Sequence, residues 1–445
     1  MIRTRLSALA ATTILLLAPA AIATANREGM TGVNVPETAA DTQVLSHEST
    51  LRAQFGLDSS RTHVRSISVD HGASSDLLGI PLTPAERANI AHRDLLIPMI
   101  DRLSQHLAKN KNFAGLWIDQ SEGGILHFAQ TSGDLSSIVK SYVTSDHPVV
   151  YERFRNSLAQ LNSTEADVTT GVLTHSAPAS YIESSSISVP DNVVSLVVID
   201  DAPPGTEQAL AKAYGSNRIS MRRGIAQARP ASSRDIRTGP LYGGEYIFNK
   251  TSDGSCTAGF SNATSGGNYF TITAGHCLNG VWYRGDRNTQ YGIGNSHSNH
   301  YIVNGSSKCD CQAVGPISSS IRTANVLVLN NGINHYVGTA TSFPTGARIC
   351  LSGATSATSG NDINCGYIKS SGGTIGEGRN YTLIDPLATS IQGTFGDSGG
   401  PVGNENVQLV GLYASTSFYM SGAFYQSYLS KAVNIGPTVG VSLVY

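Results

Sequence analysis

Two short motifs, far apart in the chain, place a serine and a histidine in settings that suit nucleophilic catalysis. Ser398 lies in QGTFGDSGGP, where the glycines let the backbone turn sharply and aim successive N–H groups at one point. His276 lies upstream, in TITAGHC. A serine hydroxyl is a weak nucleophile at neutral pH and needs a base and an anion-stabilising pocket. The two motifs therefore indicate a serine hydrolase in which His276 is the base.

The order of these residues along the chain separates the classes of serine hydrolase. Residues 396–400 formally match the GxSxG elbow of α/β-hydrolases, but that fold places its histidine after the serine. No histidine follows Ser398, which excludes this class and the GDS-type lipases. A subtilisin-like order would need an aspartate before His276 in a helical α/β domain, and the β-rich pattern disagrees. The remaining order is His, Asp, Ser, which chymotrypsin-like barrels use.

That order requires an aspartate between the histidine and the serine. The four candidates are Asp286, Asp310, Asp362 and Asp385. Asp286 follows His276 too closely to cross a barrel, and the sequence around Asp362 and Asp385 is typical of exposed turns. Asp310 opens the run Asp-Cys-Gln-Ala-Val, where apolar residues begin at once. Because a group that orients a histidine belongs at the buried start of a strand, we expect Asp310 to complete the triad.

From about Tyr242 to Tyr445 the sequence resembles the secreted bacterial branch of the chymotrypsin family, the streptogrisin and alpha-lytic type of serine endopeptidase. The resemblance is carried by Cys256-Thr-Ala-Gly-Phe260, Thr273-Ala-Gly-His-Cys277, Asp310, Gly396-Asp-Ser-Gly-Gly-Pro401 and Gly440-Val-Ser-Leu-Val-Tyr445. It implies an all-β catalytic domain of two antiparallel six-stranded β-barrels with the site between them, preceded by an α+β pro-region. It also implies a monomer that cleaves protein or peptide substrates without a cofactor or metal.

The resemblance also assigns roles around the nucleophile. The backbone N–H groups of Gly396 and Ser398 should form the oxyanion hole, and Asp397 should fix the loop rather than act as a base. The residues expected to bind substrate are Gln392, at the floor of the first specificity pocket, and Tyr413, Ala414, Ser415 and Thr416, along the substrate backbone. Because no acidic residue occurs at that floor, we expect the first pocket to bind a neutral or apolar side chain of the substrate rather than a Lys or Arg side chain.

All six cysteines lie in the C-terminal half, as expected of disulfides in an exported protein; they are Cys256, Cys277, Cys309, Cys311, Cys350 and Cys365. The resemblance implies a Cys256–Cys277 bridge behind the histidine loop and a second bridge between Cys350 and Cys365. Thr394 stands where many relatives have a cysteine, so the specificity pocket lacks a usual brace.

The two remaining cysteines flank the expected catalytic aspartate. In an extended strand, Cys309 and Cys311 would point to one face and Asp310 to the other. Their Cα separation would then be near the upper limit for a disulfide. Either a bond kinks the strand and helps aim the Asp310 carboxylate, or both thiols are free.

The length of 445 residues suggests two or three domains. With 30 Lys and Arg against 32 Asp and Glu, the net charge of −2 gives no electrostatic case for nucleic acid. Residues 1–25 have the pattern of a secretory signal peptide, with Arg3 and Arg5 before an apolar stretch and small residues at its end. We therefore expect a secreted, extracellular protein with a pro-region at 26–237 and a protease domain at 238–445.

Local patterns predict several elements of the pro-region. Thr83-Pro84-Ala85-Glu86 is a capping box that opens a helix to about Lys109, with a kink at Pro98. A second helix is predicted from Val150, Phe154, Leu158 and Leu161 on one face. The apolar run 193–199 is typical of a buried strand.

The expected pro-region ends in an arginine-rich stretch. Residues 216–237 have little periodicity and indicate a solvated linker that a protease would cut easily. We expect the cut between about Arg229 and Tyr242. In the protease domain a single helix is predicted, around residues 427–433.

Overall fold

The computed structural model describes residues 39–68, 77–224, 234, 239–285, 291–301, 305–329, 332–356, 363–376, 381–418 and 424–445. The chain divides into two compact units, Met1–Thr42 and Gln43–Tyr445. The expected signal peptide at 1–25 lies outside the described residues, as does most of the first unit. In the part that is described, no helix has the length and apolar character needed to cross a membrane.

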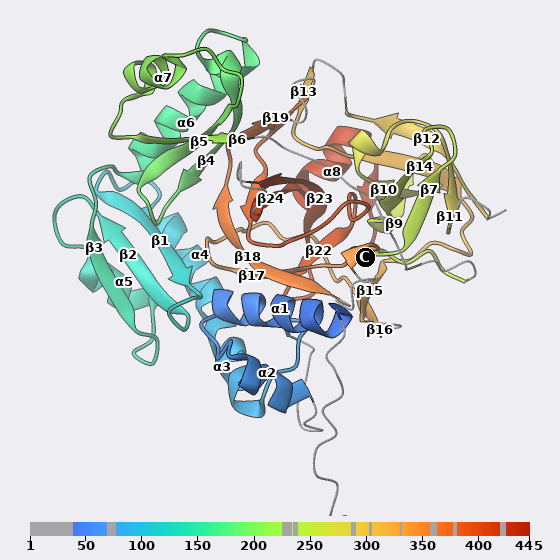
Figure 1. The fold of residues 1–445 in the computed structure, drawn as a ribbon, viewed down its shortest axis with the longest axis horizontal. Coiled ribbons are helices and arrows are strands. Elements are labelled where there is room, and N and C mark those ends of the chain that lie inside the picture. Colours follow the sequence, from blue (N-terminus) through green and yellow to red (C-terminus); the bar gives the residue numbers. More distant parts are fainter. Residues whose placement is uncertain are drawn as a thin grey trace, which may run out of the picture. The chain divides into compact units, whose positions relative to one another are not determined.

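Helices and two small sheets alternate between residues 39 and 224, as the α+β prediction requires (Figure 1). The elements are α1 (Ala39–Gln54), α2 (Arg61–Ser68), α3 (Pro84–Asp94), α4 (Leu96–Leu107), β1 (Phe113–Asp119), β2 (Ile125–Gln130), α5 (Ser136–Tyr142), β3 (Val149–Arg153), α6 (Leu158–Leu173), the 3₁₀ turn Ala179–Tyr181, β4 (Ile182–Ser188), β5 (Val193–Ile199), α7 (Thr206–Tyr214) and β6 (Ile219–Gly224). The predicted buried strand coincides with β5.

The predicted capping box starts α3. The Thr83 hydroxyl accepts from the backbone N–H of Glu86, and the Glu86 carboxylate accepts from the N–H of Thr83. The expected single helix is nevertheless two helices, α3 and α4, which meet at Leu95. A proline ring clashes with the carbonyl four residues before it and has no N–H to bond it. For Pro98 that carbonyl belongs to Asp94, where α3 ends.

Two of the predicted elements in the N-terminal part are wrong. Val150 lies in β3 rather than on a helix, and α6 begins only at Leu158, after the capping residue Ser157. A spacing of four residues fits one face of a strand as well as one face of a helix, so the pattern was ambiguous. The arginine-rich stretch is also not all linker, because β6 pairs in parallel with β5 and buries Ile219.

From residue 239 onward the described chain is mostly antiparallel β-structure, which confirms the predicted fold class. Six strands close into a barrel in the order β17-β18-β21-β24-β23-β22. The first barrel of the expected pair corresponds to an eight-stranded antiparallel sheet, β25-β9-β10-β14-β12-β11-β7-β8, which includes a strand from the C-terminal end. The predicted helix near the C-terminus is present, but its bounds are wrong: β24 pairs with β21 and β23 as far as Lys431, and the helix α8 begins only at Ala432.

The elements of this part are β7 (Tyr246–Asn249), β8 (Gly254–Thr257), β9 (Phe260–Ser265), β10 (Asn268–Thr273), the 3₁₀ turn η2 (Gly275–Cys277), β11 (Val281–Arg284), β12 (Gly292–Asn299), β13 (Gly305–Ser307), β14 (Gln312–Ile317), β15 (Asn325–Leu329), β16 (Gly332–His335), β17 (Arg348–Leu351), β18 (Asn364–Ser371), β19 (Thr374–Gly376), β20 (Tyr381–Ile384), β21 (Leu387–Thr389), β22 (Pro401–Asn404), β23 (Leu409–Phe418), β24 (Phe424–Lys431), α8 (Ala432–Val439) and β25 (Ser442–Leu443).

One sheet contains strands from both sides of the predicted domain boundary. Its order is β13-β20-β19-β4-β5-β6, so the β19–β20 hairpin continues the sheet of the N-terminal part. In the junction, Ser185 of β4 lies opposite Thr374 of β19, and their hydroxyls are 3.0 Å apart. The apolar cores are also continuous, since Ile100 and Phe128 share a buried cluster with Ile349 of the barrel.

Charged groups meet where α3 and α4 contact the barrel. Asp94 forms an ion pair of 2.7 Å with Arg348 of β17, and Asp101 accepts a hydrogen bond from Ser342. Glu405 follows β22 in the same region. Burial raises the pKa of Glu405 to about 7, and the negative charges of Asp94 and Asp101 act in the same direction, while Arg348 opposes them.

This pKa predicts that stability falls with rising pH. Folding shifts the pKa of Glu405 from 4.5 to about 7, so the fold takes up a proton between these pH values and loses stability as pH rises through them. In the full chain carrying Ser398→Ala, Glu405→Gln should therefore raise the unfolding temperature at pH 8 and not at pH 4.5. A gain of about 1 kcal/mol corresponds to roughly 2–4 °C.

The reference is the parent chain that carries Ser398→Ala alone, measured at the same two pH values. An equal shift for Glu405→Gln at the two pH values would contradict the assignment.

Candidate active site

The histidine is held at the end of β10 by a turn and a disulfide. Cys277 bonds to Cys256 of β8, which confirms this predicted bridge. Gly275 precedes His276 in the turn η2, and a Cβ there would lie 3.0 Å from the Asp310 carboxylate and 2.8 Å from the Asn299 side chain. A glycine is therefore required for the histidine loop to approach the aspartate so closely.

Asp310 is fully buried and gives both carboxylate oxygens to the histidine. One oxygen accepts from the backbone N–H of His276 at 2.8 Å, and the other lies 2.5 Å from its Nδ1. A carboxylate against Nδ1 keeps the proton on that nitrogen and leaves Nε2 as an acceptor. Of the four candidate aspartates, Asp286 and Asp362 lie outside the described residues. Of the other two, Asp310 contacts His276, whereas Asp385 forms an ion pair with Lys431.

Ser398 completes the line of contacts. Its hydroxyl lies 2.9 Å from Nε2 of His276, and the side chain is almost buried. Gly399, at φ 85°, follows it, and its N–H donates to the carbonyl of Tyr413 at 2.8 Å. A Cβ on Gly399 would lie 2.2 Å from the Thr273 hydroxyl, so the loop packs tightly on the strand that leads to the histidine. A glycine is thus needed after Ser398 because the loop of the serine directly contacts the end of β10, which leads to the histidine.

The residues expected to form an oxyanion hole lie in a tight turn. Gly396 has a φ of 88°, and its carbonyl accepts from the Thr257 hydroxyl at 2.6 Å. Within the described chain, the N–H groups of Gly396 and Ser398 donate to no other protein group. They are therefore available to a ligand, and their role as oxyanion donors stays a prediction.

Asp397 points away from the histidine and fixes the loop. Its fully buried carboxylate accepts from the backbone N–H groups of Thr355, Ser356 and Thr394, at 2.8–2.9 Å, and from the Ser356 hydroxyl. Burial raises the pKa of this carboxyl, against the lowering effect of these hydrogen bonds. The sequence assigned Asp397 to the loop, but nothing in the sequence identified Thr355 and Ser356 as its partners.

The expected substrate wall lies in β23, beside the nucleophile loop. Tyr413 and Ala414 are buried, and Ser415 and Thr416 are half-buried. The hydroxyls of Tyr413, Thr416 and Ser427 lie within hydrogen-bonding distance of one another, and Ser427 donates to the carbonyl of Ile391 at 2.7 Å. These residues connect the strand to the segment that carries Gln392.

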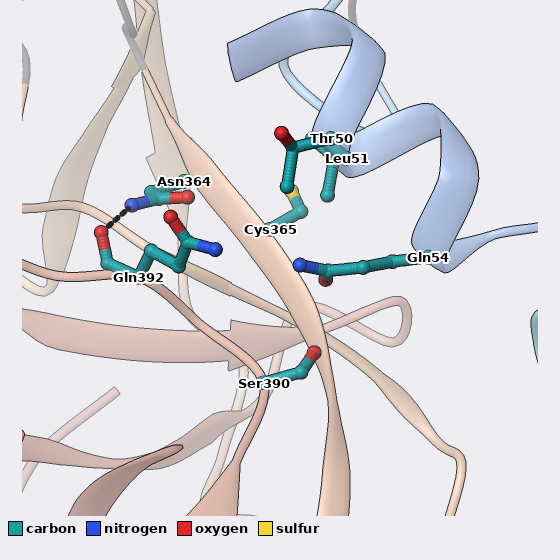
Figure 2. A pocket seen from close by; sticks show the side chains of 7 residues that line it. All are labelled: Thr50, Leu51, Gln54, Asn364, Cys365, Ser390 and Gln392. Atoms are coloured by element: carbon teal, nitrogen blue, oxygen red, sulfur yellow. Dashed lines mark hydrogen bonds between the residues drawn. The ribbon is translucent and has the colours of Figure 1, made fainter. Parts of the chain in front are cut away.

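Gln392 lies against the N-terminal part of the chain. Figure 2 shows it in a small pocket with Asn364 and with residues of α1, and the Asn364 amide donates to the Gln392 carbonyl. Together with the bonds from Ser427 to Ile391 and from Thr394 to Asp397, this contact fixes the segment around Gln392 and Thr394.

The other four cysteines form two disulfides. Cys350 and Cys365 are opposite each other in neighbouring strands and are bonded, as predicted. Cys309 and Cys311 are also bonded to each other, which decides between the two alternatives for this pair. The backbone N–H of Asp310, between them, donates to the Ser430 hydroxyl at 2.9 Å.

Comparisons with known proteins find similarity in solved structures. Neither a protein-family model nor a curated protein matches the chain. Thermobifida fusca Protease A matches with 22% identity and a TM-score of 0.38, over 46% of this chain and 98% of the other. Nocardiopsis Protease matches with 22% identity and a TM-score of 0.38, and the alpha-lytic protease homolog N4 with 23% and 0.37; each covers 46% of this chain and 100% of its own.

At these identities and TM-scores, what the three proteins do says nothing by itself about the chemistry of this chain. The fold of the C-terminal half is carried by its own strand order, a closed six-stranded barrel beside an antiparallel sheet. The residues predicted to act together, His276, Asp310 and Ser398, lie in one hydrogen-bonded line. The solved structures to which this chain is similar thus include three proteases, each matched over 46% of the chain.

Proposed function

We propose that the chain is a secreted serine endopeptidase that hydrolyses peptide bonds through His276, Asp310 and Ser398. One observation supports this above all: a buried carboxylate at 2.5 Å from one imidazole nitrogen and a serine hydroxyl at 2.9 Å from the other. A serine, a histidine and a buried acid in this arrangement have the geometry of an activated nucleophile.

Each group then has a defined step. The Ser398 oxygen attacks the carbonyl carbon of the substrate while His276 Nε2 takes its proton, and the histidine returns that proton to the leaving amine. This leaves an acyl group on Ser398. A water then attacks the acyl carbon while His276 takes its proton, and the histidine passes that proton to the Ser398 oxygen as the serine–acyl bond breaks and the acid product leaves. Asp310 stays ionised and stabilises the imidazolium in both halves of the cycle.

The negative oxygen that develops in each step needs donors that are already in place. The free N–H groups of Gly396 and Ser398 are the candidates, and each donor of this kind contributes about 3 kcal/mol. The Asp397 carboxylate lies between the two residues that carry these N–H groups, and its bonds to Thr355 and Thr394 fix the turn.

The first test separates a protease from an inactive relative that would serve as a secreted binding module. The processed protein should hydrolyse casein and react with a serine-directed fluorophosphonate. Ser398→Ala should abolish labelling and lower kcat about a millionfold. Asp310→Asn should keep Ser398 in place and lower kcat about 10⁴-fold, because the imidazole loses its orienting charge. Wild-type protein that neither cleaves casein nor takes the label would favour the binding module.

The second test concerns specificity. We propose that the first pocket takes a neutral or apolar substrate side chain, because the hydroxyls of Tyr413, Thr416 and Ser427 beside the expected substrate wall carry no charge. A peptide-library digest should yield cuts mainly after uncharged residues. Cleavage mainly after Lys or Arg would exclude this specificity while leaving the triad intact.

We further propose that residues 26–237 are a pro-region that assists folding and inhibits until it is removed. The shared sheet and the continuous apolar core support this role, since the barrel packs on the N-terminal part. Barrels whose strands pair across long stretches of sequence fold slowly, because closing long loops costs conformational entropy. A folded N-terminal part that binds the strands would reduce this entropic cost.

The third test measures this assistance. Residues 242–445 should refold to active protease much more slowly alone than with residues 26–237 added in trans. If residues 242–445 refold at the same rate with and without residues 26–237, the N-terminal part does not assist folding and can act only as an inhibitor.

A further inference from the structure

A small buried cluster lies beside Asp310, and of its members only Ala414, in the expected substrate wall, has been described above. Its members are Ile375, Tyr381, Leu383, Ala388, Ala414 and Tyr428, and Tyr301 packs against it. Tyr381 opens β20 and is almost fully buried. A buried phenol needs a partner for its hydroxyl, so its choice of partner is informative.

The hydroxyl of Tyr381 donates to the carbonyl of Cys309 at 3.0 Å. Cys309 immediately precedes Asp310, whose own N–H donates to Ser430, and the carbonyl of Cys311 accepts from the N–H of His300 at 3.1 Å. The peptide group between Cys309 and Asp310 is therefore hydrogen-bonded at both its carbonyl and its N–H, and the carbonyl of Cys311 is bonded to a third segment. The first of these three bonds comes from the side chain of Tyr381, in the β19–β20 hairpin.

The ring of Tyr381 is also connected to His276, through the ring of Tyr301. It lies 4.5 Å, centroid to centroid, from the ring of Tyr301. Tyr301 in turn meets the imidazole of His276 edge-on at 6.2 Å. One side chain thus contacts the backbone next to Asp310 through its hydroxyl and the neighbour of His276 through its ring.

We propose that Tyr381 is a positioning residue for the Asp310–His276 pair, on the basis of the proposed peptidase function. It touches neither substrate nor the reacting atoms. Its hydroxyl fixes the peptide before Asp310, and its ring keeps Tyr301 against the imidazole, so the hydrogen bond between the acid and the base has one geometry.

The position of Tyr381 also connects this pair to the N-terminal part of the chain. β20 pairs with β19, β19 pairs with β4, and on its other edge β20 pairs with β13, shortly before Asp310. The hairpin that presents Tyr381 is therefore held on one side by residues 182–188. A contact that fixes the β19–β20 hairpin therefore also fixes the position of Asp310.

The decisive variant is Tyr381→Phe, which keeps the ring and removes the bond to Cys309. Loss of one such hydrogen bond should lower kcat about two- to tenfold with KM unchanged. Because a less fixed Asp310 stabilises the imidazolium less, the acid limb of the kcat/KM profile should move to lower pH.

Tyr428→Phe is the matched control, since Tyr428 lies in the same buried cluster and its hydroxyl bonds to Ser184 instead. It should alter stability as much as Tyr381→Phe does, with kcat and the pH profile unchanged. Tyr301→Leu, a second variant at a half-buried position, should lower kcat through the ring contact and leave the hydroxyl bond in place.

A measurement on inactive protein separates this proposal from the peptidase function. In the full chain carrying Ser398→Ala, the His276 Nδ1 proton should give a far-downfield proton resonance. Tyr381→Phe should shift or broaden that resonance, and Tyr428→Phe should not. Unchanged resonance and pH profile in Tyr381→Phe would overturn the proposal, even if the chain is a protease. A shifted resonance in a chain without peptidase activity would support the positioning role and refute the function.

Discussion

The pairing of a buried carboxylate with the N–H groups of a single histidine is the constraint on which the rest of the site depends. Asp310 has no exposed surface, and an ion moved out of water costs several kcal/mol unless it is paired and hydrogen-bonded. His276 meets that demand twice, through its backbone and its ring. Because both bonds come from one residue, the loop of the histidine and the strand of the aspartate must meet at a fixed distance. The glycine at 275 and the Cys256–Cys277 bridge follow from that requirement.

The nucleophile loop obeys a second constraint of the same kind. Asp397, next to the serine, is also buried, but four neutral donors surround it. Two adjacent residues therefore have opposite tasks: the carboxylate binds the loop to residues 355–356, and the hydroxyl of Ser398 faces the histidine. The positive φ angles of Gly396 and Gly399 allow this reversal of direction between neighbouring side chains.

How far the sequence predicts the structure depends on where the determining contacts lie. His276 and Ser398 were found because their neighbours in sequence set the local geometry, and Asp310 followed by elimination from the order of the triad. The partners of Asp397 were missed, because a contact between residues about forty positions apart has no local pattern. Val150 was misplaced because a spacing of four residues suits both a strand and a helix.

Asp310 depends on contacts with the N-terminal part of the chain more than His276 and Ser398 do. β19 and β20 have 3 and 4 residues, and a hairpin so short is marginal by itself. It is completed by β4 on one edge and β13 on the other. The contact between Ser185 and Thr374 spans 189 residues, and such a closure is entropically costly unless both partners are already ordered. The sheet β4–β5–β6 contains one antiparallel and one parallel pairing between nearby segments and can form first. Once it has formed, it offers an edge to the hairpin, and the hairpin brings Tyr381 to the peptide before Asp310. The serine and the histidine need no such step, because their loops are joined directly through Gly399 and Thr273.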